Sequence, residues 1–275
     1  MSKTSQDLMA TSSQRRVAGA EIGSHHHRLH QIVYPSRGAV AVTTSMGTWI
    51  SAANRAIWIP AGATHQHRFH GDTQFHCVAF DPGKYAAVSH VPAVLLVDAL
   101  ARELIVACSQ AEDIGDAANA RRLDVLYDQL CMSAPQPLWI PSPKDHRLRQ
   151  ACRITAENLA TPLALNHIGR MIGVSPRTLS RLFAADVAMS YRQWRTQLRV
   201  HHALRLLAEQ HTVTEIAHAC GWATPSAFIE TFKRTLGYTP GQHQNADSRS
   251  EQRGNSRQAR GSIADQRMDG RQRGR

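Results

Sequence analysis

The second half of the chain contains one pattern twice, and few folds satisfy it. An apolar run with helical spacing is followed by a glycine and then by Ser-Pro or Thr-Pro, at about 163–185 with Ser175 and at about 212–236 with Thr224. Ser or Thr before Pro favours a helix N-cap with proline in the first turn. Glycine after an apolar run favours the end of a helix. Each copy therefore predicts a helix-turn-helix unit.

Further capping signals set the helices around these units. The stretches SYRQ from Ser190 and TVTE from Thr212 fit the capping box, and Thr161 before proline predicts another N-cap. Between the two copies, residues 191–208 have the pattern of one continuous helix, about 27 Å long at 1.5 Å per residue. With its flanking turns, such a helix can hold two reading helices roughly 34 Å apart, which is one turn of DNA.

The second helix of each copy has an apolar side and a polar side at 100° per residue. The apolar sides are formed by Leu179, Leu182 and Phe183, and by Phe228, Phe232 and Leu236. The opposite sides carry the candidate DNA-contacting residues, which are Arg177, Ser180 and Arg181, and Ser226, Ala227, Glu230, Lys233 and Arg234. Exposed arginines at i and i+4 can reach guanine edges or phosphates. The alternative is a solvated charged face, and Glu230 can either accept from cytosine N4 or pair with Arg234.

The net charge of +11 is unevenly distributed. Residues 145–243 hold 12 basic and 6 acidic side chains, and residues 244–275 hold 8 and 4. Residues 1–144 are almost balanced, at 12 and 11. This distribution favours a neutral sensing or structural module joined to a module that meets a polyanion, which we expect to be double-stranded DNA.

The chain divides by composition into segments of different character, with two domains among them. We expect an N-terminal all-β barrel with added helices and a C-terminal all-α double helix-turn-helix. The segments are a disordered N-terminus (1–20), a β-rich barrel (21–82), a helical connector (84–132), a proline-rich linker (133–143), the helix-turn-helix domain (144–243) and a basic disordered tail (244–275). The tail adds nonspecific, salt-sensitive attraction to DNA or has no role. With neither a signal peptide nor a membrane span in the pattern, we expect a cytoplasmic protein.

Histidines are concentrated in the first half, and strand alternation assigns them to faces. Side chains two apart share a face of a strand, so His25, His27 and Gln31 project together if the segment is extended, while His26 and His30 point the other way. An H-x-H pair holds a metal only with further ligands from elsewhere. The WIPAGATHQH stretch supplies a candidate in His65, which shares its face with His67.

At the level of motifs, residues 145–243 resemble the DNA-binding domain of AraC/XylS-type transcriptional regulators. The matching stretches are SPRTLSRLF, YRQWRTQLRVHHALRLLAE and VTEIAHACGWATPSAFIETFKRTLGYTPGQH. The resemblance implies two helix-turn-helix units on adjacent major-groove segments. Three positions depart from the family: Ala188 stands where Gly is usual, Gly169 where a small Ala is usual, and His243-Gln244 where Tyr-Arg commonly closes the domain.

Residues 21–82 resemble the cupin barrel that such regulators commonly carry as a sensing domain. The first motif, H-x-H-x(3)-E-x(6)-G, matches His25, His27, Gln31 and Gly38, and the second, P-x-G-x(2)-H, matches Pro60, Gly62 and His65. This resemblance implies a divalent metal on His25, His27 and His65, with Gln31 in place of the usual carboxylate. The layout is similar to that of a nickel-responsive subgroup, so we expect Ni, Zn or a similar metal.

Several alternatives accompany this interpretation. The barrel can bind a small organic effector without metal, or be purely structural; the protein can be a metal-cupin enzyme fused to a DNA-binding domain, or a nonspecific binder driven by its tail. The lost carboxylate and the DNA-reading module argue against an enzyme. The connector helices can form a homodimer contact or an internal core through Leu95, Leu96, Leu100 and Leu104, or through Leu123, Leu126 and Leu130.

Overall fold

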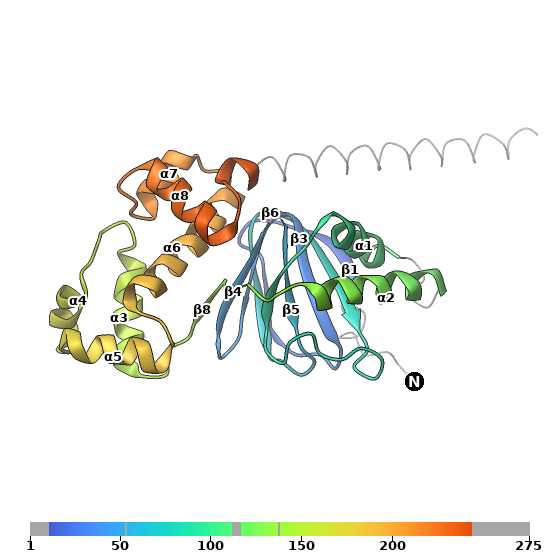
Figure 1. Cartoon of the computed structure of the whole chain (residues 1–275), viewed down its shortest axis with the longest axis horizontal. Helices are drawn as coiled ribbons and strands as arrows, with labels where there is room; N and C mark the ends of the chain where they lie inside the picture. The colour runs from blue at the N-terminus through green and yellow to red at the C-terminus, as the bar shows by residue number, and fades with distance from the viewer. Residues whose placement is uncertain (1–10, 53, 112–116, 137, 244–275) are drawn as a thin grey trace, which may run out of the picture.

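The computed structural model describes residues 11–52, 54–111, 117–136 and 138–243 (Figure 1). The strands are β1 (Ser12–Arg16), β2 (Glu21–His25), β3 (His30–Thr43), β4 (Gly47–Ala52), β5 (Arg55–Ile59), β6 (His65–Phe80), β7 (Ala93–Leu96) and β8 (Trp139–Pro141). The helices are α1 (Ala99–Ser109), α2 (Ala117–Met132), α3 (His146–Glu157), α4 (Leu165–Ile172), α5 (Pro176–Asp186), α6 (Tyr191–Ala208), α7 (Val213–Ala219) and α8 (Pro225–Leu236). We call β1–β8 with α1 and α2 the sheet domain, and α3–α8 the helical domain.

Two long strands, β3 and β6, form the centre of the antiparallel sheet and pair along most of their length. The first part of β6 pairs with β2 and the later part with β1, while β5 and β4 pair with the two ends of β3. The β3–β6 register shifts between Pro35 and Ala39. Irregularities of this kind bend a strand, so the two ends of the sheet face different partners.

Both faces of the sheet are covered. Alternation along β3 places Ile32 in a core with α1 and α2, and places Val33 in a second core that continues into the helical domain. Figure 1 shows α1 and α2 on one side of the sheet and α6 on the other. Burial on both faces explains the nearly continuous apolar runs of β3 and β5.

The structure decides part of the question about the connector leucines. Leu95, Leu126 and Leu130 are fully buried within the chain. Leu96 and Leu100 remain 41% and 50% exposed. Most of the connector leucines therefore belong to an internal core. A homodimer contact stays a prediction for Leu96 and Leu100 alone.

Three strands lie outside the range predicted for the barrel. Residues 12–16, expected to be disordered, form β1 against β6. Residues 93–96, expected to be helical, form β7 against β5, and residues 139–141 of the expected linker form β8 against β4. In each case the isolated segment has weak or helical character, and an unpaired sheet edge supplies the hydrogen bonds that decide the outcome. Residues 1–10 and 244–275 lie outside the described residues.

The capping signals of the helical domain are largely confirmed. Ser175 and Thr224 cap α5 and α8 with proline behind them, and Ser190 and Thr212 form capping boxes on α6 and α7. The N-cap predicted at Thr161 is wrong, because α4 begins only after Ala164. The helix over 191–208 is confirmed as α6.

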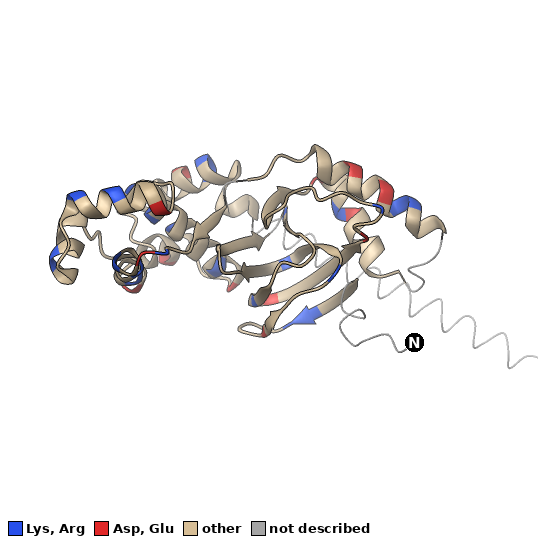
Figure 2. Ribbon diagram, turned by 90° about the horizontal axis from the view of Figure 1, so that it is seen from below, with Lys and Arg blue, Asp and Glu red and all other residues tan. Residues whose placement is uncertain are grey.

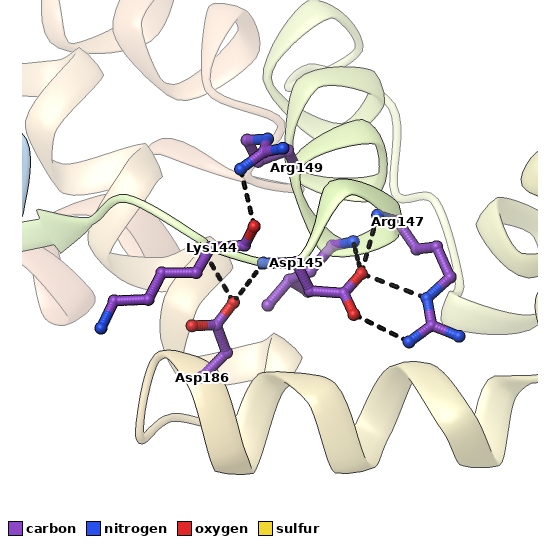
Figure 3. Close-up of polar contacts among 6 residues, drawn as sticks. Lys144, Asp145, Arg147, Arg149 and Asp186 are labelled. Carbon is purple, nitrogen blue, oxygen red and sulfur yellow. Dashed lines mark hydrogen bonds and ion pairs between the residues drawn. The ribbon is translucent and has the colours of Figure 1, made fainter.

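The start of α3 is anchored to the end of α5. Asp186 accepts hydrogen bonds from the backbone amides of Lys144 and Asp145 at 2.7 and 2.9 Å (Figure 3). Asp145 in turn caps α3 by accepting from the amides of Arg147 and Leu148. This arrangement ties the entry of the helical domain directly to its first helix-turn-helix unit.

In the part of the chain that the structure describes, no helix combines the length and the apolarity that a membrane crossing requires.

Candidate DNA-reading helices and histidine site

The predicted DNA-contacting side chains lie on the outer surfaces of α5 and α8. Their inner sides are closed by Leu179 and Phe183 in α5 and by Phe228 and Phe232 in α8, all fully buried. The outward residues are exposed, except Ala227, which is half-buried; they are Arg177, Ser180, Arg181, Ser226, Glu230, Lys233 and Arg234. Figure 2 shows basic residues distributed along the helices of this domain. The roles of these side chains toward DNA stay predictions.

Glu230 has a partner within its own helix. Its carboxylate lies 3.8 Å from the Arg234 guanidinium, one turn further along α8, and both side chains are mostly exposed. An exposed pair at this spacing contributes only a few tenths of a kcal/mol. Breaking the pair between Glu230 and Arg234 therefore costs little free energy.

Two residues of the first unit, Gly169 and Ala188, differ from the family pattern, and both have structural consequences. A Cβ on Gly169 would lie 2.3 Å from the Val174 carbonyl oxygen, so the turn between α4 and α5 is built around a glycine. Ala188, in the turn after α5, has a φ of 53°. This left-handed backbone is the conformation that glycine adopts without a steric penalty.

Histidines from two paired strands meet at one end of the sheet. His25 and His65 are directly opposite in the register of β2 and β6, and His67 lies two residues further along the same side of β6. Their candidate ligand atoms all lie within 4.8 Å of one another. We call His25, His65 and His67 the histidine trio.

Backbone carbonyls orient two of the three rings. His25 Nδ1 donates to the Gly23 carbonyl oxygen and His65 Nδ1 to that of Ala63, each at 2.8 Å. In the neutral ring this leaves the Nε2 lone pair available. A carbonyl partner on one ring nitrogen is the usual way that proteins fix a metal-binding imidazole.

His67 is the most unusual member of the trio. It is 2% exposed, and among the residues that the structure describes neither of its ring nitrogens has a hydrogen-bond partner. Buried polar atoms are normally paired. Burial lowers the pKa of His65 to about 4 and that of His67 well below its ordinary value, with neighbouring histidines adding to both shifts. Both rings are therefore neutral near pH 7, as metal ligation requires.

The structure brings together only part of the predicted ligand set. His25 and His65 meet, but His27 lies beside the trio with its Nε2 3.1 Å from Gln31 Oε1 and its Nδ1 donating to the Leu29 carbonyl. His67 was not among the predicted ligands, although its shared parity with His65 was a signal for it. His67 comes close to His25 only through the pairing of β2 with β6, and the spacing of residues in the sequence does not reveal that pairing.

The prediction for the other side of the first histidine segment is half right. His26 is exposed, whereas His30 is buried and accepts a hydrogen bond from the Ala61 amide. The His30 ring packs 5.2 Å from that of Trp58. An outward face is solvated only if nothing covers the sheet, and here helices cover that side.

Two capped helix pairs on one shared helix, joined to a sheet domain with a buried polar site, define an effector-responsive DNA-binding regulator. Residues 13–127 match the model of the AraC-like ligand binding domain, and residues 168–246 match that of a helix-turn-helix domain. The chain belongs to the AraC-type transcriptional regulators. Its domains and relatives are those of regulators and not of enzymes.

Among similar proteins is the HTH-type transcriptional regulator NimR of Escherichia coli K12, which is 29% identical over 221 residues, or 80% of this chain and 81% of NimR. The regulator RipA of Corynebacterium glutamicum is 32% identical over 100 residues, or 36% of this chain and 30% of RipA. A solved DNA-binding transcriptional dual regulator from E. coli K-12 is 27% identical, with 40% of this chain and 97% of that chain covered and a TM-score of 0.35.

Proposed function

We propose that this regulator responds to a divalent transition metal, with nickel favoured, that binds the histidine trio. The observation that carries the proposal is His67, a buried imidazole beside His25 and His65 whose two nitrogens have no hydrogen-bond partner among the described residues. Uncharged imidazoles suit late first-row metals such as Ni, Cu and Zn. His27 is the candidate for a fourth ligand, since its ring centre lies 5.1 Å from that of His65.

The metal-free site has an energetic cost that a metal would reduce, because the ion would pair one nitrogen of each ring. Leaving buried polar atoms unpaired costs about 1–3 kcal/mol for each group. Because the folded chain arranges the ligands and the unfolded chain does not, metal binding stabilises the fold by about 2.7 kcal/mol at a hundredfold excess over Kd. A bound metal therefore favours the sheet conformation that holds His25, His65 and His67 together.

The experiment compares two histidine variants of untagged protein. His67→Ala removes a trio member, and His26→Ala removes an exposed neighbour of His25 that lies outside the trio. We expect Ni²⁺ affinity, measured by titration calorimetry, to fall by more than about 100-fold in the first variant and to stay unchanged in the second. Equal affinity in both variants would contradict the proposed site.

Footprinting on the upstream region of the protein's own gene tests the link to DNA. We expect protection by the wild-type protein to change when Ni²⁺ or Zn²⁺ is added, and protection by His67→Ala to be unresponsive. Protection that is identical with and without metal in the wild type would instead favour the organic effector in a metal-free sheet domain.

A further inference from the structure

The boundary between the two domains does not coincide with the boundary between hydrophobic cores. One side of α6 packs on the sheet, and its buried residues share a core with β3, β4 and β6. The same core includes Ile216, Phe228, Phe232 and Leu236 of α7 and α8. The first unit is different, because the buried residues of α3, α4 and α5 lie in two smaller cores apart from the sheet core. One of these cores also includes Trp194 near the start of α6, so α6 contacts both units. The second helix-turn-helix unit is thus packed as an extension of the sheet domain.

A glycine on β6 allows a close approach between the two domains. Gly71 has a φ of 67°, and a Cβ at this position would lie 2.0 Å from the carbonyl oxygen of Ala208, the last residue of α6. Such a contact with backbone cannot be relieved by a rotamer change. Beside it, the buried His70 ring lies 3.7 Å from the carboxylate of Glu209, the C-cap of α6. The end of α6 therefore rests directly on the β6 backbone.

A buried arginine makes the second point of attachment. Arg55, at the start of β5, is 1% exposed, and its Nη2 donates to the Leu236 carbonyl oxygen at 2.6 Å. Its guanidinium also lies 4.9 Å from the centre of the Tyr238 ring. Leu236 is the last residue of α8, where the free carbonyls of a helix favour a cation. The sheet domain thus holds the C-terminal end of the second reading helix.

Strand β6 connects this attachment to the histidine trio. His65 and His67 lie near its start, His70 and Gly71 follow within four residues, and the fully buried Phe69 lies between them. A short, packed stretch of β6 therefore connects the trio to the end of α6. Both reading helices must fit successive major-groove segments at once, so the placement of α8 relative to α5 sets the affinity for DNA.

We propose that the sheet domain and the second helix-turn-helix unit move as one body, joined at Gly71 and Arg55, and that β6 transmits the state of the trio to α8 while the first unit moves separately. We call the contacts of Gly71 and Arg55 with the helical domain the joint. That the joint holds the two parts together is independent of any metal. The transmission through β6 rests on the proposed metal response.

The test uses two glycine variants in the full-length protein without metal. Gly71→Ala inserts a methyl group against Ala208, whereas Gly19→Ala places one in open space at a comparable φ of 78°. We expect amide hydrogen exchange in α7 and α8 to be at least about tenfold faster in Gly71→Ala than in Gly19→Ala, with α3, α4 and α5 unchanged. Equal exchange of α8 in the two variants would overturn the proposal.

A milder variant covers the case in which Gly71→Ala does not fold. Arg55→Gln removes the hydrogen bond to Leu236 without a steric clash, and we expect at least about tenfold faster exchange at the C-terminal end of α8. Unchanged exchange there would contradict the role of Arg55 in the joint.

Repeating the exchange measurement with Ni²⁺ distinguishes a failure of the joint from a failure of the metal response. With saturating Ni²⁺, we expect exchange in α8 to change in the wild type but not in Gly71→Ala, although calorimetry gives both the same Ni²⁺ affinity. Absence of Ni²⁺ binding by the wild type would refute the metal response, and the metal-free comparison would still decide the joint. A wild-type protein that binds Ni²⁺ with no change in α8 would refute transmission through β6.

Discussion

At the scale of single residues, backbone conformation exposes a position where this chain carries a steric cost. Ala188 has a φ of 53°, in the left-handed region, at a position where the sequence resemblance leads one to expect glycine. A left-handed alanine costs about 1–2 kcal/mol, partly offset by the greater freedom of glycine in the unfolded chain. The turn is thus tolerated because Met189 and the surrounding core hold it, and not because alanine favours it.

Replacing Ala188 with glycine should therefore stabilise the protein. We expect Ala188→Gly to raise the free energy of unfolding by up to about 1 kcal/mol, measured from the denaturant midpoint. Ala184→Gly, at an exposed position inside α5, is the control and should lower it by about 1 kcal/mol. A loss of stability in both variants would show that the backbone of Ala188 is not strained.

At the scale of elements, the two reading helices present different chemistry. The outer surface of α5 carries Arg177 and Arg181 with no acidic side chain in its first turn, whereas the outer surface of α8 combines Glu230 with Lys233 and Arg234. Phosphate contacts add affinity without sequence information, and base contacts add discrimination. We infer that a single arginine matters more in α5, where no carboxylate of the same helix pairs with it in the described structure.

Arg181 provides the test of this difference. We expect Arg181→Ala to weaken binding to the operator by about 1–3 kcal/mol. If Arg181 contacts a phosphate, the slope of log K against log salt should also fall by about 1. Arg153→Ala removes the same charge from an exposed position on α3, outside both reading helices, and serves as the control. Equal losses in the two variants would mean that α5 acts only through its charge.

At the scale of the whole molecule, buried histidines lie at the places where helices meet the sheet. His76 bridges Ser36 of β3 and Ser109 of α1, His201 of α6 is buried, and His243 stacks on Tyr238. Burial lowers the pKa of His76 to about 4, that of His201 to about 3 and that of His243 to about 4. These pKa values link the packing of the whole chain to pH.

The sign of the pH dependence follows from proton uptake. The unfolded chain protonates these rings near pH ~6.5, while the folded chain leaves His76 and His243 neutral until about pH 4 and His201 until about pH 3. The free energy of unfolding should therefore be highest above about pH 6.5, where the rings are neutral in both the folded and the unfolded chain. It should fall as the pH drops below that value, by up to about 1.4 kcal/mol per pH unit for each ring. Denaturant unfolding of metal-free protein at several pH values measures the slope, and His76→Gln should make it shallower. A slope that the variant leaves unchanged would exclude His76 as a contributor.

The helical domain could be read almost completely from its sequence because its signals are local. Ser175, Ser190, Thr212 and Thr224 bond to amides three residues away, and the apolar sides of α5 and α8 follow from helical spacing alone. The error at Thr161 has the same origin, since a local signal was present but the chain continues extended to Ala164. The order of the domains and the two-domain fold class could also be predicted from the sequence, because short motifs indicate both.

Only the tertiary structure could decide which distant residues meet. Strands β1, β7 and β8 form because sheet edges far away in sequence offer hydrogen bonds, and no local pattern contains those partners. His67 lies with His25 and His65 in the trio because β2 and β6 pair in one particular register. Gly71 and Arg55 join the domains through contacts to Ala208 and Leu236, more than a hundred residues away. Helix signals act over one turn of backbone, whereas strand pairing and domain packing are determined by the competition among long-range contacts of the whole chain.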